Sequence, residues 1–480
     1  MAGALDLASV TDHSATTWAQ DIIPALHDYI AIPALSPAFD AEWAAHGHVA
    51  AAVELVATWC RRRPVAGLSV EVAELPGRTP IILMEVPAFG GGPTDDTVLL
   101  YGHVDKQPEM VGWRDGLGPW TPVREGDRLY GRGGADDGYA AFASLAAIEA
   151  TQRAGGAHAR CLVLIEASEE SGSHDLAAHL EALADRIGTP SLVLCLDSGC
   201  LDQERLWATT SLRGLVGGTL AVEILEEGVH SGLASGVVPS SFRILRELLE
   251  RVEDATTGEV LLPELHVEVP PDRQREIDET ARSAAAPAAQ FPFVAGAGPV
   301  TGDAAGQILG HTWRPALSVI GADGLPPTNR AGNVLRPRTA LKLSFRLPPT
   351  CDEAAAEAAI ATALTTDPPY GARVTFTDRE TGPGWNAPPF APWLDAALET
   401  ASRAGWGQSY RAFGEGGSIP FMGMLGARFP DAQFVVTGVL GPGSNAHGPN
   451  EYLHLPSAER VTTALSVVLD GHARRDGAHG

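Results

Sequence analysis

Histidine and carboxylate side chains recur where apolar stretches end, and residues of these types can bind metal ions. The apolar run 97–100 leads to His103, and Asp105 follows two residues later. Residues i and i+2 of an extended chain point to the same side, so Asp105 can reach a ring nitrogen of His103. A metal-binding histidine is usually held in this way. Taken alone, the pair could also be two satisfied polar residues at the end of a strand.

Acidic residues then recur at three further places that follow apolar or glycine-rich stretches. They are Asp136 with Asp137, Glu169 with Glu170, and Asp197. Adjacent like charges repel each other, and a bound cation removes the repulsion. A solvated turn would explain any one of these acids, but it explains the whole set poorly.

The residue types favour zinc. Histidine and carboxylate ligands suit this metal, and a late histidine, His447, adds to the set. The number of candidate ligands indicates two metal ions that share a bridging carboxylate. Because adjacent side chains point in different directions, one glutamate of the pair 169–170 can bind metal while its neighbour serves as a general base.

An α/β fold must position these residues. Strands alternate with helices over residues 1–210, which predicts a mostly parallel sheet. Ligands bind beyond the carboxyl ends of the strands in such sheets, and the candidate ligands come at those ends. From residue 211 the order strand, helix, strand, strand, helix, strand predicts a small α/β sandwich inserted into the larger domain. The stretch 258–310 is rich in Ala and Pro, and its helices and strands are left largely unassigned.

Composition limits the possible functions. The chain has 480 residues, 45% of them hydrophobic, and a formal net charge of -25, so nucleic-acid binding through a basic face is not expected. Five scattered cysteines argue against a disulfide framework and fit a reducing cytosol. We expect no signal peptide at the N-terminus and no apolar run long enough to span a membrane.

Motifs in a fixed order over nearly the whole chain resemble those of the M20 family of metallopeptidases, in particular its carnosinase-like, cytosolic non-specific dipeptidases. The motifs are Gly102-His103-Val104-Asp105, Gly131-Arg132-Gly133-Gly134-Ala135-Asp136-Asp137-Gly138, Glu169-Glu170-Ser171-Gly172-Ser173, Asp197, His230-Ser231-Gly232, Gly416-Gly417-Ser418-Ile419-Pro420 and His447. The resemblance implies a two-domain α/β fold: a di-zinc peptidase sheet with flanking helices, and an inserted lid domain through which two subunits form a homodimer. We expect the catalytic domain at 1–210 and 385–480 and the lid at 211–384.

The resemblance also implies roles for single residues. His103 and Asp197 would hold one zinc, Glu170 and His447 the other, and Asp136 would bridge both, with a cis bond to Asp137. Manganese or cobalt could replace zinc. Glu169 would be the general base, and Asp105 would orient His103.

Further residues would bind a peptide substrate. Arg346 would hold its C-terminal carboxylate, and Asn333, Gly417 and Ser418 would contact the rest of it. His230 would enter the neighbouring subunit's site and stabilise the developing oxyanion. Three plainer interpretations stay open: a surface ion pair for Arg346, a turn residue for Asn333, and a cap of its own loop for His230.

Two positions depart from the family pattern, and both could alter substrate range. Gly138 and Tyr139 stand where the family usually has a lysine, and Ser168 precedes the glutamate pair where it usually has a glutamate or methionine. The sequence therefore predicts a cytoplasmic dipeptidase. Alternatives are an N-acyl-amino-acid hydrolase or a carboxypeptidase of the same chemistry, and a catalytically silent metal-binding protein, against which the intact Glu169 argues.

Overall fold

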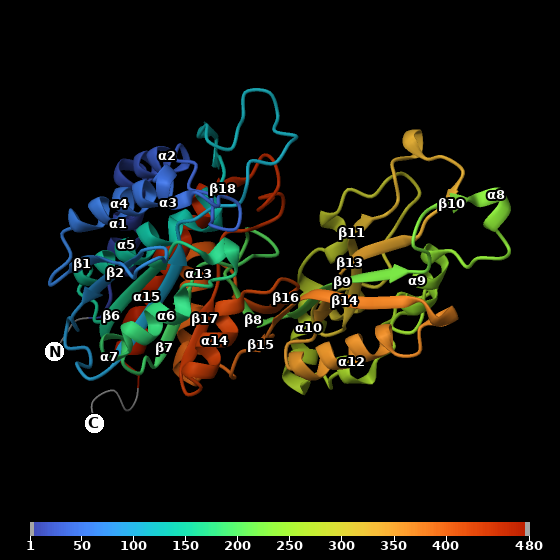
Figure 1. Cartoon of the computed structure of the whole chain (residues 1–480). Helices are drawn as coiled ribbons and strands as arrows, with labels where there is room; N and C mark the ends of the chain where they lie inside the picture. The colour runs from blue at the N-terminus through green and yellow to red at the C-terminus, as the bar shows by residue number, and fades with distance from the viewer. Residues whose placement is uncertain (1–3, 476–480) are drawn as a thin grey trace. The chain divides into compact units, whose positions relative to one another are not determined.

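The computed structural model describes residues 4–475, without the side chain of Pro420, and the chain divides into two compact units (Figure 1). The first unit comprises Met1–Thr210, Ala387–Phe413 and Met424–Gly480, and the second comprises Ser211–Asn386 and Gly414–Gly423. The outermost residues expected in the catalytic domain, 1–3 and 476–480, lie outside the described part. The short segment Gly414–Gly423 groups with the second unit because its backbone bonds to Arg213.

A mixed sheet forms the centre of the first unit. Its strands follow the order β1 (Ser69–Ala73), β2 (Ile81–Val86), β6 (Arg160–Glu166), β3 (Thr97–His103), β7 (Leu192–Cys195), β17 (Gln433–Val436) and β8 (Trp207–Leu212). The four central strands, β6, β3, β7 and β17, run parallel. β1, β2 and β8 pair antiparallel at the two sides. The α/β class expected from the sequence is confirmed, and the parallel part of the sheet carries the candidate ligands.

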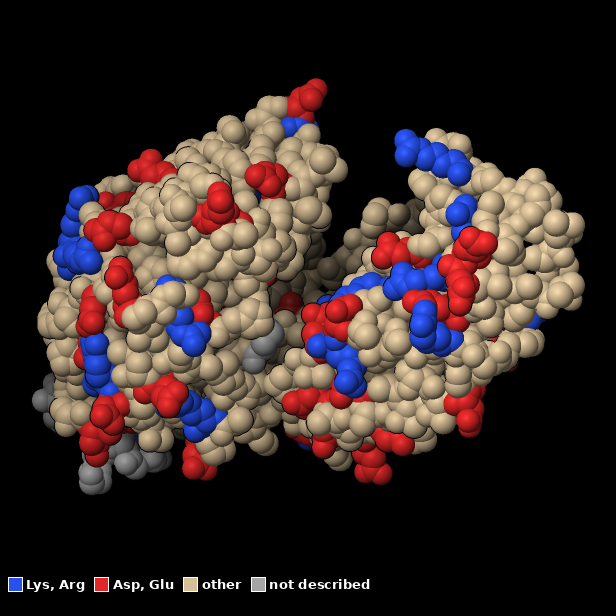
Figure 2. Space-filling view, in the orientation of Figure 1, with Lys and Arg blue, Asp and Glu red and all other residues tan. Residues whose placement is uncertain are grey.

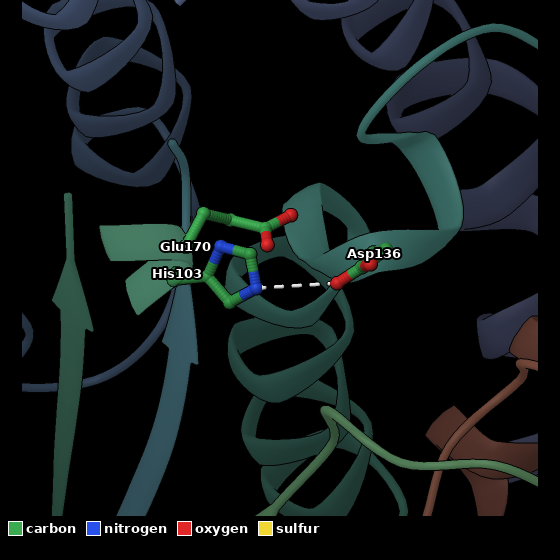
Figure 3. A group of neighbouring side chains, drawn as sticks. All are labelled: His103, Asp136 and Glu170. Carbon is green, nitrogen blue, oxygen red and sulfur yellow. Dashed lines mark ion pairs between the residues drawn. The ribbon is translucent and has the colours of Figure 1, made fainter. Parts of the chain in front are cut away.

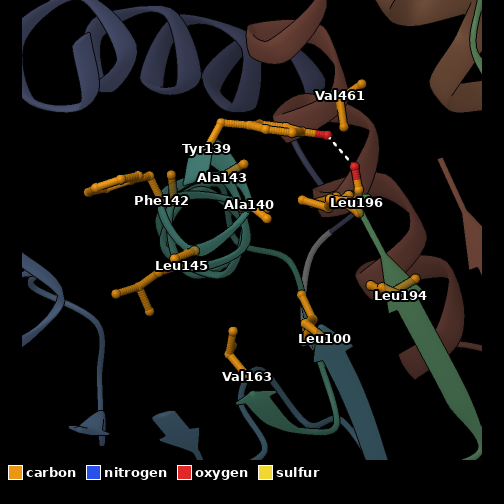
Figure 4. Close-up of a cluster of buried hydrophobic side chains, with 14 of the residues drawn as sticks. Leu100, Tyr139, Ala140, Phe142, Ala143, Leu145, Val163, Leu194, Leu196 and Val461 are labelled. Atoms are coloured by element: carbon orange, nitrogen blue, oxygen red, sulfur yellow. Dashed lines mark hydrogen bonds between the residues drawn. The ribbon is translucent and has the colours of Figure 1, made fainter. Parts of the chain in front are cut away.

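The buried helix α5 (Tyr139–Arg153) packs against this sheet. Its residues 139–151 are all buried, and most are alanine or other small residues, which allow close approach to the strands. Figure 4 shows Leu145 of the helix above Leu100 and Val163 of the sheet. At the N-terminal end of α5, the Tyr139 hydroxyl donates to the Leu196 carbonyl oxygen at 2.7 Å. The helix is therefore fixed next to the strand ends at which the acids lie.

Other helices complete the first unit. They are α1 (Leu7–Thr17), α2 (Ile23–Ile30), α3 (Trp43–His46), α4 (His48–Arg61), α6 (Leu176–Ala182), α7 (Ala184–Ile187), α13 (Pro392–Trp406) and α15 (Leu455–Ala473), together with the part of α14 (Pro420–Arg428) from Met424 onward. The sequence of residues 18–30 predicts an opening helix. In the structure the first helix begins earlier, at Leu7, where the Asp6 side chain caps it by accepting from the backbone amides of Ala8 and Ser9.

A small three-stranded sheet joins the end of the chain to its middle. β18 (Tyr452–His454) pairs with β5 (Arg128–Tyr130), which pairs with β4 (Val123–Glu125). The sequence of residues 452–469 predicts a helix, and that prediction is wrong for the first three residues, because they pair with β5 as a strand. This pairing brings the loop before β18 next to the loop that follows β5.

The second unit is built on an antiparallel sheet in the order β11 (Ala316–Asp323), β13 (Arg338–Leu347), β9 (Gly214–Glu223) and β14 (Arg373–Gly382). Helices α9 (Ser241–Leu249) and α12 (Glu353–Thr365) pack on one of its faces around Leu343 and Phe345. The stretch 258–310, which the sequence left largely unassigned, contains α10 (Pro271–Ser283) and α11 (Ala304–Thr312), which pack around Trp313.

None of the helices described within residues 4–475 is long and apolar enough to cross a membrane. On the face of the molecule in Figure 2, basic side chains lie among acidic ones and form no continuous basic surface there.

Candidate metal centre

Three neighbouring strands deliver the candidate ligands to one place. His103 is the last residue of β3, the turn η3 (Glu169–Ser171) follows β6, and Asp197 follows β7. Since β6, β3 and β7 are adjacent and parallel, their carboxyl ends lie at the same edge. The sheet therefore places His103 between the two glutamates on one side and Asp197 on the other.

Asp136 lies between two histidines. Its Oδ1 atom is 3.3 Å from Nε2 of His103, and its Oδ2 atom is 3.0 Å from Nε2 of His447. Glu170 completes this side of the site, with Oε2 3.3 Å from Nε2 of His447. Figure 3 shows the side chains of His103, Asp136 and Glu170 converging. The peptide bond between Asp136 and Asp137 is cis. A carboxylate with one oxygen near each histidine has the arrangement that a metal-bridging ligand requires.

A second group of ligand atoms shares His103. His103, Glu169 and Asp197 each offer one atom, and these atoms lie within 4.8 Å of one another. The His103 Nε2 atom is 3.9 Å from a carboxylate oxygen of Asp197. His103 is thus common to two possible metal positions, and Glu169 lies beside one of them.

The orientation of His103 makes the site suitable for a metal ion. Its Nδ1 atom donates to the backbone carbonyl oxygen of Asp105 at 3.1 Å, so Nε2 presents its lone pair to the acids. Nε2 is buried and forms no hydrogen bond with any residue in the described part of the chain. A buried nitrogen without a hydrogen bond, facing several carboxylates, fits a metal ligand.

Asp105 also holds the glutamate pair. Its carboxylate accepts from the backbone amides of Glu169 at 3.1 Å and Glu170 at 3.0 Å, while its Oδ1 atom stays 3.6 Å from Nδ1 of His103. The sequence suggested that this carboxylate would orient His103. In the structure the Asp105 backbone makes the shorter contact with the ring, and the carboxylate fixes the turn that carries the two glutamates.

The acids strongly influence one another. Burial, followed by the charge of Asp197, raises the pKa of Glu169 well above its usual range, and burial with the charge of Asp136 does the same for Glu170. Burial also raises the pKa of Asp137. Burial opposes ionisation of Asp136 as well, but the interactions with His103 and His447 outweigh it and lower the pKa of that carboxyl. The site holds more buried carboxylates than histidines, an excess that divalent cations would neutralise.

A buried ion pair ties the loops of the centre together. Arg132 and Glu451 are both almost fully buried, with Nη1 and Oε2 at 2.5 Å. Arg132 also donates to the carbonyl oxygens of Gly448 at 2.8 Å and Pro108 at 3.2 Å, and Glu451 accepts from the amide of Gly133 at 2.9 Å. The pair therefore links the segment after Asp105, the loop before Asp136 and the loop of His447.

The second unit contains the remaining predicted residues in two groups. Ser418 accepts from Nη1 of Arg346 at 2.9 Å, and the adjacent Gly417 accepts from the amide of Arg213. His230 lies at the end of the short strand β10 (Val229–His230), which pairs with β12 (Val334–Leu335), and the Asn333 carbonyl oxygen accepts from the amide of Ser231. Nδ1 of His230 accepts from the amide of Gly232 at 3.1 Å, so it caps its own loop and leaves its exposed Nε2 atom available.

Sequence reasoning missed three residues of these sites as participants: Arg132, Glu451 and Arg213. Arg132 lies in the glycine-rich motif of residues 131–138, and its neighbouring glycines could have indicated burial. Glu451 and Arg213 carry no local signal, because their partners are distant in sequence.

Comparison with known proteins identifies the fold and the family. The sequence model of peptidase family M20/M25/M40 matches residues 99–470. The cysteinylglycine-S-conjugate dipeptidase of Corynebacterium striatum is 27% identical over 386 residues, covering 78% of this chain and 80% of that protein. The Beta-Ala-His dipeptidase of Homo sapiens is 29% identical over 284 residues, covering 58% of this chain and 54% of that protein. The structure of the di-peptidase Dug1p from Saccharomyces cerevisiae superposes with a TM-score of 0.75 at 21% identity, covering 98% of this chain and 99% of that one.

We expect the Arg132–Glu451 pair to control both stability and metal binding. Arg132→Met leaves Glu451 buried without its partner, a change that typically costs ~3–5 kcal/mol of unfolding free energy. It should also weaken binding of the metal that His447 helps to hold. Denaturant unfolding of the protein after its metal has been removed with a chelator measures the effect on stability. Calorimetric titration with zinc measures the effect on metal binding.

Arg403→Met is the matched control, because Arg403 forms an exposed ion pair with Glu399, and such pairs contribute about 0–1 kcal/mol. Equal unfolding midpoints and equal zinc binding for the two variants would contradict the role given to Arg132.

Proposed function

Because this chain belongs to peptidase family M20/M25/M40, we propose that it is a metallodipeptidase that hydrolyses the amide bond of dipeptides or similar small substrates with a free C-terminal carboxylate. The observation that carries the proposal is the position of Asp136 between His103 and His447, with Glu170 and Asp197 on either side. The dipeptidase activity printed for the relatives from Corynebacterium striatum and Homo sapiens supports this substrate size.

We assign two divalent ions to the centre, zinc in the first instance, with manganese or cobalt as possible substitutes. His103 and Asp197 would hold one ion, Glu170 and His447 the other, and Asp136 both. Bound there, the ions supply an activated water molecule and polarise the scissile carbonyl group. The chemistry of the donors, imidazole nitrogen and carboxylate oxygen, suits zinc.

We assign the proton transfer to Glu169. Its backbone amide donates to the Asp105 carboxylate, and one of its carboxylate oxygens lies within 4.8 Å of ligand atoms of His103 and Asp197. Burial and the charge of Asp197 raise its pKa above the usual range. It would accept a proton from water and deliver it to the leaving amine. Arg346, with Ser418 at its side, would hold the substrate carboxylate through a charge-assisted hydrogen bond.

A substrate panel tests the proposal. Purified protein with zinc, manganese or cobalt should hydrolyse dipeptides faster than tripeptides and N-acetyl amino acids. Faster hydrolysis of N-acetyl amino acids would instead identify an acyl-amino-acid hydrolase, and faster release of C-terminal residues from longer peptides a carboxypeptidase. No hydrolysis of any substrate with stoichiometric metal bound would mean a silent metal-binding protein.

Glu169→Gln separates the general base from the ligands. Because the amide cannot accept the proton, turnover should fall ~10²–10⁴-fold, while two metals per subunit remain by elemental analysis. Glu170→Gln is the matched control and should lose metal together with activity. If the Glu169 variant loses metal and the Glu170 variant retains it, then Glu169 is the metal ligand and Glu170 the general base.

We further propose a homodimer formed through the second unit. β11 is an edge strand of the four-stranded sheet, with Ile320 63% exposed. The loop of His230 exposes two more large apolar side chains, Leu233 at 83% and Val237 at 82%. Unpaired strand edges and apolar surface of this kind favour association. In the dimer, the exposed Nε2 atom of His230 would serve the partner's catalytic centre as a donor to the oxyanion.

Mixing two inactive variants tests this arrangement. His230→Ala and Glu169→Ala homodimers should each be nearly inactive. When the two are co-expressed, one of the two sites in each heterodimer combines an intact Glu169 with an intact His230, so activity should return to at most half of the wild-type value per dimer. Isolated heterodimers that stay as inactive as their parents would place His230 in its own chain's site or outside catalysis.

We also assign the protein to the cytoplasm. All five cysteines are free thiols, and four of them are buried, as expected for a protein from a reducing compartment. Fractionation of the native host would test this assignment.

A further inference from the structure

Arg213 is a buried arginine of the second unit that has no acidic partner. Only 8% of its surface is exposed. Two other arginines are buried to a similar degree, and both are paired: Arg132 with Glu451, and Arg273 with Glu276 at 3.1 Å. Within residues 4–475, no carboxylate lies within ion-pair distance of Arg213 or of Arg346. Arg213 therefore carries a buried charge that nothing in the described chain neutralises, and such charges are costly.

Arg213 builds the turn that presents Ser418. Its backbone amide donates to the Gly417 carbonyl oxygen at 3.0 Å, and its Nε atom donates to the Gly416 carbonyl oxygen at 2.9 Å. Its own carbonyl oxygen accepts from the Ser418 hydroxyl at 2.5 Å. The same hydroxyl accepts from Nη1 of Arg346 at 2.9 Å. One serine oxygen thus joins the two arginines, and the turn is held from both sides.

The two guanidinium groups influence each other. Burial and the charge of Arg346 lower the pKa of Arg213 to about 10. Burial also lowers the pKa of Arg346. The nitrogens Nη1 and Nη2 of Arg213 form no hydrogen bond with a described residue. A carboxylate placed here would attract both guanidinium groups and accept hydrogen bonds from the unused donors.

We propose that Arg213 and Arg346 form one anion-binding site, in which Arg213 fixes the Gly416–Ser418 turn and supplies the second positive charge for a substrate carboxylate. The choice of a substrate carboxylate rests on the proposed function, while the existence of the anion site rests on the two unpaired arginines alone. A guanidinium fork matches the planar geometry of a carboxylate. Arg213 is in this sense a positioning residue that determines specificity for substrates with a free carboxyl terminus.

Steady-state kinetics on the metal-loaded protein tests the specificity. Arg213→Met should lower kcat/KM for a dipeptide about 10- to 100-fold, mainly through a higher KM. The C-terminal amide of the same dipeptide should change little, because it has no negative charge to bind. Arg213→Lys keeps the charge and should recover part of the loss. Equal losses on the dipeptide and its amide would show a merely structural role and overturn the proposal.

Arg251→Met is the matched control. Arg251 also lies in the second unit and donates to backbone carbonyl oxygens, those of Ala363, Thr366 and Asp367. It thus holds a loop through backbone carbonyl oxygens in the same manner as Arg213. Its substitution should leave the ratio of dipeptide to amide hydrolysis unchanged, and a changed ratio would count against the proposal.

A binding measurement keeps the anion site testable even if no dipeptide is hydrolysed. Sodium acetate should raise the melting temperature of the metal-loaded wild-type protein, because a ligand that binds the folded state stabilises it. Because acetate can also bind at the metals, only the part of the shift that disappears in both Arg213→Met and Arg346→Met reports on the arginines. That part should persist in Arg251→Met. An identical shift in all four proteins would overturn the anion site.

Discussion

The buried ion pair between Arg132 and Glu451 is the contact on which the catalytic centre depends. Its partners are 319 positions apart in the sequence, and its hydrogen bonds reach Pro108, Gly133 and Gly448. Each of these residues adjoins a segment that carries a ligand or its support. The acids of the centre repel one another, so their loops would separate if nothing held them. A neutral, fully satisfied pair placed behind the ligands holds the loops without adding net charge to the site.

The sheet also fixes the positions of several candidate ligands. Three adjacent parallel strands end at one edge, which fixes His103, the turn of Glu169 and Glu170, and Asp197 in a row. Asp136 and His447 cannot come from that row, because each lies on a loop outside it. The pairing of β18 with β5 and the Arg132–Glu451 pair bring these two residues over the strand ends. The centre therefore needs both regular sheet geometry and irregular loops held by buried polar contacts.

This division explains how much could be predicted from the sequence. The strands of the parallel part were recognisable, since burial on a parallel sheet gives continuous apolar strands. The candidate ligands could then be identified as the polar residues at the ends of these runs. The helices α10 and α11 were not recognisable, because α10 has a single large apolar residue, Ile277, and α11 contains two glycines, Gly306 and Gly310. The strand β18 was read as the start of a helix because its pairing with β5 is a tertiary contact. The contribution of Asp105 to the glutamate turn and the isolation of Arg213 depend on three-dimensional neighbours that no local pattern encodes.

Arg213 and the acids of the metal centre are positioned in the same physical way. In both places the chain buries charges of one sign and provides too few opposite charges to neutralise them. The cost is kept within bounds by backbone hydrogen bonds: Asp105 accepts two amides at the glutamate turn, and Arg213 donates to two carbonyl oxygens at the serine turn. These bonds fix position without cancelling charge. The charge of such a site therefore remains available to a ligand of the opposite sign. The acids can attract cations, and Arg213 can attract a carboxylate.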